Sequence, residues 1–442
     1  MRLSQKNTLD KKWFTLISKA GSFEFYRLLD GNKKFRNKQQ ALFFKGTLKN
    51  PVLDYPFLKK TFLEKNKKEL SNIKTTLLLK EKSDLVKSAY TLKIDEKISE
   101  IEMLEAVAKK DFKKFMDYSI RLYGQPSKKL FYNIISQLKL KIKKHLGSKR
   151  LNLRNVSVAL WKTLPKKSFF DGLFYPDAKL RSLVKHETLK EFGKLIALKK
   201  TRRVFTASEI RKIFDKKLRK LGIDDWKIKI DYTSNTSIYV DQKKKALIIP
   251  ILKRVCNNGL RYLLIHEIGT HILRRKNGEK SALQLLGLGL NDVEMAEEGI
   301  ATVRGQALNK NFEDFSGIDG FLAVSFALGL DGKPRDFRET FEMLKQYYLF
   351  NSLCSGDDFR GAERYAKLTA WDRCVRTFRG TNCKMPGICF TKDIIYRQGN
   401  INIWKALLKN PAEIKRFSIG KYDPANPKHT WILDQLNITE KN

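Results

Sequence analysis

Hydrophobic residues recur at helical spacing through the first 200 residues of the chain. Most lie three or four positions apart between Lys-rich stretches, as in the series Ile101, Leu104, Val107 and Phe112 and the series Leu130, Ile134, Leu138 and Ile142. This spacing places apolar side chains on one face of an α-helix. We therefore expect residues 1–200 to form a helical N-terminal region built from several amphipathic helices.

From residue 201 the pattern alternates between helix and strand. Thr206 and Glu209 fit a capping box, which predicts a helix that runs to Leu221. Strand-like runs follow at residues 226–232, 237–241 and 245–250, and a turn joins the last two. An apolar helix is predicted over residues 259–274. The pattern indicates an α+β fold that is mostly helical, with a small mixed sheet next to this helix and a second domain over residues 201–442.

Charge is the most unusual feature of the composition. The 442 residues carry 89 Lys and Arg against 47 Asp and Glu, a formal net charge of +42. A field of this strength attracts polyanions, so we expect a negatively charged partner. Residues 1–200 hold 47 of the basic and 19 of the acidic side chains. The N-terminal region is therefore the expected contact surface.

The five cysteines indicate a reducing compartment. Their number is odd and no C-x-x-C pair occurs, which argues against a disulfide framework or a four-thiolate zinc site. The N-terminus has no apolar segment of signal-peptide length, and no uninterrupted apolar run of about 20 residues appears. We expect a cytoplasmic protein without a Sec signal or a membrane span.

Two of the five histidines fall within the apolar helix predicted at residues 259–274. His266, Glu267 and His271 form a His-Glu-x-x-x-His motif, one residue longer than the His-Glu-x-x-His motif of zinc peptidases. On an ideal α-helix, residues i and i+5 point roughly 140° apart, so the two imidazoles cannot reach one ion. A π-bulge absorbs one residue and brings them to the same side, and Gly269 eases such a distortion. The motif thus predicts local departure from α-helical geometry and a zinc site.

A catalytic zinc ion needs three protein ligands and one open position. Residues 294–301 supply three glutamates at the start of another predicted helix. Glu297 and Glu298 are adjacent and point about 100° apart on a helix, so only one of them can ligate, and the other either orients a histidine or faces solvent. The spacing alone does not choose between them.

Several segments together resemble the microtubule-associated tyrosine carboxypeptidase family, the tubulin-detyrosinating zinc metallopeptidases and their bacterial relatives. They are HEIGTHILR, EEGIATV, RTFRGTN, PGICFTKDIIYRQGN and FSIGKYD, over about residues 200–423, with FFKGTLKNPVLDYP near residue 50. The resemblance implies a zincin-like catalytic domain over residues 201–442. It also implies His266, His271 and Glu298 as zinc ligands and Glu267 as the catalytic base.

The family's reaction is removal of a C-terminal tyrosine from the acidic tail of α-tubulin, so the resemblance implies a zinc metallocarboxypeptidase with tubulin or microtubules as partner. A carboxypeptidase must bind a free carboxylate, a task suited to Arg or Lys. Arg376, Arg379 and Lys392 lie in the family-like C-terminal segment, and Tyr396 is placed to donate to a developing oxyanion. These four residues are the candidate substrate-binding residues.

Two questions stay open at this stage: whether the protein is an enzyme, and what role one of the predicted strands has. A non-catalytic basic protein that binds nucleic acid or a filament would share the charge, although no zinc finger, RNP-like stretch or Gly-rich phosphate loop is present. The strand carrying Leu247, Ile248 and Ile249 can either pair with an extended substrate or lie buried in the core.

Overall fold

The structure is a computed structural model that describes residues 8–20, 28–166, 176–198, 202–232, 238–309 and 317–438. It is mostly helical and contains two small sheets. The expected α+β class with a predominance of helix is therefore confirmed. No helix in the described ranges is long and apolar enough to cross a membrane. All five cysteines are free thiols, as their number and spacing predicted.

The described residues before 200 are helical, as their periodicity predicted. The helices are α1 (Lys11–Ala20), α3 (Lys33–Phe44), α4 (Lys60–Lys80), α5 (Asp84–Ala108), α6 (Phe112–Tyr123), α7 (Lys128–Lys143), α8 (Leu151–Thr163) and α9 (Ala178–Ile196). Side-chain caps fix several of their starts: Ser83, Ser127 and Asp177 each accept from a backbone amide three residues later. These caps satisfy amide groups that a helix leaves unpaired at its N-terminus.

Helices also predominate after residue 200. Those outside residues 257–279 and 294–309 are α10 (Ala207–Lys220), α13 (Leu285–Leu288), α15 (Ile318–Leu328), α16 (Phe337–Cys354), α17 (Phe359–Thr377), α18 (Ile394–Lys409) and α19 (Pro427–Gln435), with 3₁₀ turns η2 (Thr391–Asp393) and η3 (Pro411–Arg416). The predicted capping box is present at α10. The Thr206 hydroxyl accepts from the Glu209 amide at 3.4 Å, and the Glu209 carboxylate accepts from the Thr206 amide at 2.9 Å.

The larger sheet has three strands in the order β2-β4-β3 and is mixed. Strand β2 (Lys227–Asp231) runs parallel to β4 (Ala246–Pro250), and β3 (Tyr239–Asp241) pairs antiparallel with β4, with Val240 opposite Leu247. The predicted hairpin is thus confirmed for its described residues; Ser237 lies outside them. A second pairing, between β1 (Phe205–Thr206) and β5 (Arg254–Val255), was not foreseen from the sequence.

Strand β4 is the central strand of this sheet. Leu247, Ile248 and Ile249 are buried. The backbone of β4 is hydrogen-bonded to β2 on one side and to β3 on the other. A substrate strand therefore cannot pair with it, and the alternative of a strand buried in the core is correct.

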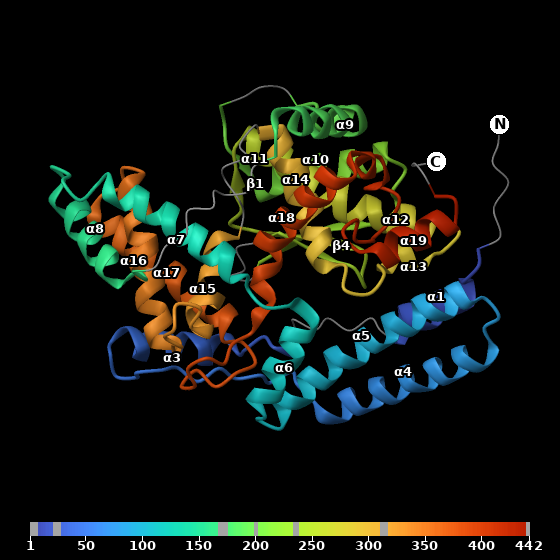
Figure 1. Cartoon of the computed structure of the whole chain (residues 1–442), viewed down its shortest axis with the longest axis horizontal. Coiled ribbons are helices and arrows are strands. Elements are labelled where there is room, and N and C mark those ends of the chain that lie inside the picture. The colour runs from blue at the N-terminus through green and yellow to red at the C-terminus, as the bar shows by residue number, and fades with distance from the viewer. Residues whose placement is uncertain are drawn as a thin grey trace.

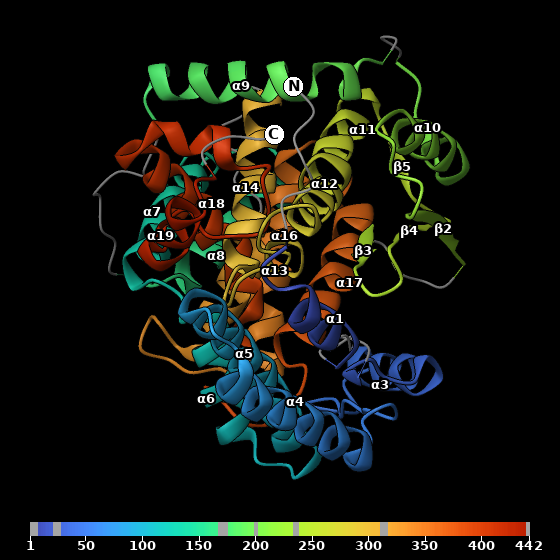
Figure 2. The same ribbon diagram turned by 90° about the vertical axis from the view of Figure 1, so that its right-hand side faces the viewer.

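The helices form two outer groups around a central group (Figure 1). Helices α1, α4, α5 and α6 pack together along one side, and α7, α8, α16 and α17 form one end of the molecule. Between them, α14 (Glu294–Asn309) packs against α18 on one side and the π-helix η1 (Leu264–Ile272) on the other, while α9 lies across η1 and α14 (Figure 2). Hydrophobic cores join residues from both sides of position 200, as where Leu63 and Leu70 share a core with Leu286 and Tyr422. The division into two domains stays a prediction.

Candidate metal centre

The His-Glu-x-x-x-His motif lies in a π-helix. Helix η1 follows α11 (Asn257–Leu263) directly and continues into α12 (Leu273–Glu279). In a π-helix, backbone hydrogen bonds link residues five apart, so each turn holds more residues than an α-helical turn. The Thr270 hydroxyl shows the same spacing, because it donates to the carbonyl of Ile265 at 3.0 Å. The local distortion predicted from the spacing of His266 and His271 is confirmed.

Gly269 lies where helix α9 crosses the π-helix. A Cβ atom at this position would approach the ring of Phe192 to 3.2 Å, and Leu195 lies next to it. The φ angle of Gly269 is not positive, so the backbone does not need glycine for its conformation. The small residue is therefore needed for close packing of α9 onto η1, a role that the sequence did not indicate.

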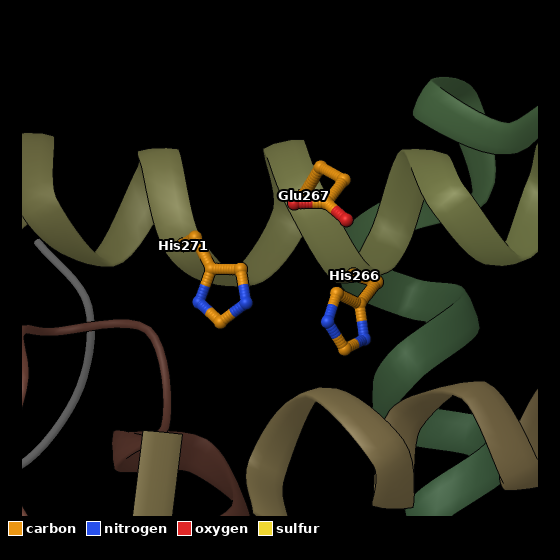
Figure 3. A group of neighbouring side chains, drawn as sticks. All are labelled: His266, Glu267 and His271. Atoms are coloured by element: carbon orange, nitrogen blue, oxygen red, sulfur yellow. The ribbon is translucent and has the colours of Figure 1, made fainter. Parts of the chain in front are cut away.

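The π-helix brings both imidazoles to the same side, as Figure 3 shows. Their ring centroids are 4.9 Å apart and the rings are nearly perpendicular, at 83°. Potential ligand atoms of His266, Glu267 and His271 all lie within 4.8 Å of one another. Two nitrogen donors and a glutamate oxygen thus lie close together, as binding of one metal ion would require.

Helix α14 adds a second carboxylate to the imidazoles. Oε2 of Glu298 lies 3.6 Å from Nε2 of His266, and Oε1 of Glu298 lies 3.9 Å from Nε2 of His271. Ligands bound to zinc at 2.0–2.1 Å in a tetrahedron are separated by roughly 3.3 Å, so these distances are close to those of a shared coordination sphere. The Glu298 carboxylate therefore faces both imidazoles, whereas Glu297 faces only one of them.

A pair of glycines allows α14 to reach this position. A Cβ atom on Gly299 would collide with the carbonyl group of Gly399 in α18, and a Cβ atom on Gly399 would collide with the carbonyl of Met295. The two helices can therefore cross closely only because both positions lack a side chain. This contact sets the location of Glu298, the residue immediately before Gly299.

Glu297 orients the imidazole of His271 through a hydrogen bond. Its Oε1 accepts from Nδ1 of His271 at 3.0 Å, and its Oε2 accepts from the guanidinium of Arg274 at 2.6 Å. Burial alone would raise the pKa of Glu297, but Arg274 and Lys421 lower it well below its usual range. A permanently ionised carboxylate at Nδ1 keeps the proton on that nitrogen and leaves Nε2 free to bind a ligand.

Arg274 and Glu297 also connect residues 420–422 to the candidate metal centre. The buried Arg274 also donates to the carbonyls of Gly420 and Tyr422, at 2.8 and 3.0 Å. The ammonium group of Lys421 lies 3.5 Å from Glu297. The family-like segment FSIGKYD thus contributes to the support of His271, a role that the sequence did not reveal.

The protonation states of the donors suit a cation. Burial, with a further contribution from His271, lowers the pKa of His266 to about 3, so its imidazole is neutral at physiological pH. Burial raises the pKa of Glu267 to about 7. The buried Nδ1 of His266 and Oε2 of Glu298 have no hydrogen-bond partner among the described residues. Burial lowers the pKa of His271, but the hydrogen bond to Glu297 and the charge of Glu298 outweigh burial and raise it, so a metal ion would displace a proton from this imidazole. The two imidazoles and a carboxylate with an unsatisfied oxygen form a donor set that fits zinc.

Two of the candidate substrate-binding residues interact electrostatically with Glu298. Burial raises the pKa of Glu298, and Arg376 is among the charges that oppose this rise. Burial and then the charge of Glu298 raise the pKa of Tyr396. The guanidinium of Arg376 and the phenol of Tyr396 therefore share the electrostatic environment of Glu298.

The other two candidates have different surroundings. Lys392 forms an ion pair with Glu294, one helical turn before Glu298, and its ammonium lies 5.0 Å from the centre of the Tyr123 ring. Burial lowers the pKa of Arg379, and the nearby positive charge of Arg376 lowers it further. The roles of these side chains in substrate binding stay predictions.

A series of alternating acidic and basic side chains holds Arg376 in place. The sequence did not predict this series. Asp393 accepts from Nε and Nη2 of Arg376 at 3.0 and 2.7 Å and from Arg373 at 2.7 Å. Arg373 in turn donates to Asp319 at 2.6 Å, and the Tyr348 hydroxyl donates to the same carboxylate at 2.7 Å. The alternation of charge fixes the guanidinium plane of Arg376. Only the TKD sequence before α18 could have suggested Asp393 as its partner.

The geometry defines a candidate site for a divalent metal ion next to a buried glutamate. In comparison with known proteins, residues 177–307 match the model of the microtubule-associated tyrosine carboxypeptidase family. The matched range contains η1 and most of α14, and so includes His266, Glu267, His271 and Glu298. The resemblance that the sequence motifs indicated is confirmed for this part of the chain.

Individual relatives are similar at a modest level. The chain is 30% identical over 181 residues to microtubule-associated tyrosine carboxypeptidase 1 of Rattus norvegicus, and 28% identical over 178 residues to the Homo sapiens protein of the same name. Each match covers 39% of this chain and 33% of the relative. The similarity therefore spans about a third of the length of these relatives. No solved structure matches the chain.

Proposed function

We propose that the protein is a zinc-dependent carboxypeptidase of zincin-like architecture that removes a C-terminal residue, tyrosine, from an acidic protein tail such as that of α-tubulin. One observation carries the proposal: the Glu298 carboxylate lies 3.6 and 3.9 Å from the Nε2 atoms of His266 and His271. The names of the similar proteins support the reaction and the class of substrate.

His266, His271 and Glu298 would hold the zinc ion. A zinc ion at such a site lowers the pKa of a bound water toward neutrality and polarises a carbonyl group. Glu267 is next to His266 in the sequence and within 4.8 Å of both imidazole ligand atoms. It therefore has the position of a general base that accepts a proton from the attacking water and returns it to the leaving amine.

Arg376 is suited to bind the substrate's terminal carboxylate. Two of its five N–H groups are bound to Asp393 and the guanidinium is also hydrogen-bonded to Tyr396, so further donors still remain, and its side chain is 40% exposed. Because Asp393 holds the guanidinium from one side, a carboxylate can form paired hydrogen bonds with the other donors. The positive charge next to Glu298 would place the scissile bond close to the metal and distinguish a chain end from an internal peptide.

The positive charge of the protein supports an acidic substrate. The excess of 28 basic over acidic side chains in residues 1–200, from 47 and 19, creates a field that attracts an Asp- and Glu-rich tail. Attraction of this kind raises the rate of encounter and weakens with added salt.

Peptides that end in varied residues, with mass spectrometry of the products, test this function. We expect loss of a single terminal residue, fastest when it is tyrosine and the preceding residues are acidic, and inhibition by a chelator. The variant Glu267→Gln should retain stoichiometric zinc and lose turnover, whereas His266→Ala and Glu298→Ala should lose zinc. Chelator-resistant cleavage, or full activity of Glu267→Gln, would refute the proposal.

A further inference from the structure

A second surface, far from the metal centre in the sequence, has properties of its own. Residues 118–170 contain no Asp or Glu and 13 Lys and Arg. This stretch includes helices α7 and α8, which pack against each other and, through α8, against α16. Figure 1 shows α8 at the outer end of the molecule. An acid-free segment of this length on one end of the fold concentrates positive charge there.

Helix α8 buries one face and exposes an unusual opposite face. Leu153, Ser157 and Leu160 point into the protein. On the outer face, Leu151 is 57% exposed and Trp161 is 39% exposed, while Arg154 and Lys162 lie between and beside them. The exposed positions recur at helical spacing. Single exposed large apolar side chains are common on protein surfaces. Several of them on one helix face, flanked by cations, are unusual.

The neighbouring end of α7 continues this surface. Leu140 is 45% exposed, and Lys139 lies 5.8 Å from the centre of the Trp161 ring in a cation–π contact between the two helices. Lys143 and Lys144 follow on the exposed side of the α7 C-terminus. We refer to the whole surface as the basic tip, and define it by Leu140, Lys143, Lys144, Lys149, Leu151, Arg154, Val158, Trp161 and Lys162.

The cations of the basic tip are available to a partner. Within the described part of the chain, no carboxylate forms an ion pair with Lys143, Lys144 or Lys149, nor with Arg154 or Lys162. No ion pair among the described residues therefore offsets their mutual repulsion, although Asp357 and Asp358 line a pocket with Arg150 and Leu151. Contact with an anionic surface would relieve this repulsion and release counterions.

We propose that the basic tip binds an anionic lipid surface. A cluster of four to eight Lys and Arg on an amphipathic helix is the pattern that attracts acidic phospholipids. Tryptophan and aliphatic side chains between the cations fit the headgroup boundary, where apolar groups enter the outer acyl region while ammonium groups remain among phosphates. A nucleic acid backbone or an acidic peptide would neutralise the charge but leave Leu140, Leu151 and Val158 without an apolar partner.

Co-sedimentation of the full chain with vesicles tests the proposal. Vesicles of phosphatidylserine mixed with phosphatidylcholine should bind the protein, and vesicles of phosphatidylcholine alone should not. The triple variant Lys144→Glu, Arg154→Glu and Lys162→Glu should weaken binding by about tenfold or more, because each cation near such a surface contributes roughly a factor of five. Trp161→Ser should weaken it without any change in charge, and added salt should weaken binding of the wild type.

The matched control is Lys65→Glu, Lys68→Glu and Lys80→Glu, three exposed positions on α4 that change the net charge by the same amount. This variant should bind vesicles as the wild type does. Absence of binding by the wild type, or equal losses in the tip and control variants, would overturn the proposal. Binding of duplex DNA or of an acidic peptide through the tip without binding of vesicles would also overturn it. Circular dichroism of each variant shows that the helices are intact.

Discussion

Nδ1 of His271 and Oε1 of Glu297 lie 3.0 Å apart, and the opposite oxygen of the same carboxylate is bound to the buried Arg274. The Glu297 carboxylate thus links His271 of the candidate metal centre to Arg274, which also donates to the carbonyls of Gly420 and Tyr422. This link gives the two adjacent glutamates of helix α14 separate tasks. Glu298 faces the candidate metal position, and Glu297 orients the candidate ligand His271.

Replacement of Glu297 by Gln should weaken zinc binding by about 10- to 100-fold, because the amide no longer fixes the proton on Nδ1 of His271. Competition with a chelator of known affinity measures the change. Glu294→Gln on the same helix is the control, since Glu294 pairs with Lys392 and does not contact the imidazoles. An affinity unchanged by Glu297→Gln would show that His271 does not depend on this carboxylate.

Replacement of Gly299 by Ala should destabilise the protein by about 1–3 kcal/mol, because the added methyl group meets the backbone of Gly399 and the side chain of Ile403. The change should also displace Glu298 and reduce metal affinity. Chemical denaturation measures the first effect. Gly193→Ala in α9 is the contrasting case, since a methyl group there has no neighbour within 4 Å and should stabilise the helix by up to about 1 kcal/mol. Similar effects of the two substitutions would contradict the close crossing of α14 and α18.

Replacement of Asp393 by Asn should release Arg376 and raise KM for peptides with a free terminal carboxylate by about tenfold, with a smaller effect on kcat. Zinc content should not change. If Arg376 binds the terminal carboxylate, wild-type protein should reject peptides that end in a carboxamide, and the Asp393→Asn and Arg376→Ala variants should discriminate less. Arg364→Ala, an exposed position on the same helix α17, should behave as wild type. Unchanged discrimination in Arg376→Ala would exclude this arginine as the carboxylate receptor.

Stability should fall on acidification because of His429. This side chain is 2% exposed, and its Nδ1 accepts from the amide of Asp423 at 3.1 Å, a bond that only the neutral imidazole can form. Burial, aided by the charge of Lys93, lowers its pKa to about 4 from the usual 6.5 of histidine. The unfolded chain therefore binds the proton first, and the stabilising contribution of neutral His429 is present above pH 6.5 and is lost as the pH falls toward 4.

Between pH 7 and pH 5 this linkage lowers the free energy of unfolding by about 2 kcal/mol. Urea denaturation at both pH values measures the difference, and His429→Gln should reduce it by that amount. His186→Gln, at an exposed position on α9, should leave the difference as in the wild type. A difference between the two pH values that is as large in His429→Gln as in the wild type would assign it to other groups.

The features predicted correctly from the sequence depend on residues close together along the chain. The interval of five between His266 and His271 predicted a distorted helix, because an ideal one separates the imidazoles, and the π-helix η1 is that distortion. The capping box at Thr206 and the hairpin of β3 and β4 likewise follow from local chemistry. For such features the physical constraint is contained in a few consecutive residues.

The features that were missed depend on residues far apart in the sequence. Arg274 and Lys421 meet at Glu297, and Asp319 reaches Arg376 only through Arg373 and Asp393. No periodicity predicts such contacts, since the tertiary fold alone determines which buried charges become neighbours. The central position of β4 was left open for the same reason: an apolar strand has the same sequence pattern in the middle of a sheet and at an edge next to a ligand.

The three bonds of Arg274 have a consequence for biosynthesis. Because two of its partners are carbonyl groups at Gly420 and Tyr422, the pocket around His271 cannot be completed while a ribosome still holds those residues. A nascent chain would carry both histidines long before it could organise them, so the pocket around His271 should form only after residues 420–422 have left the ribosome.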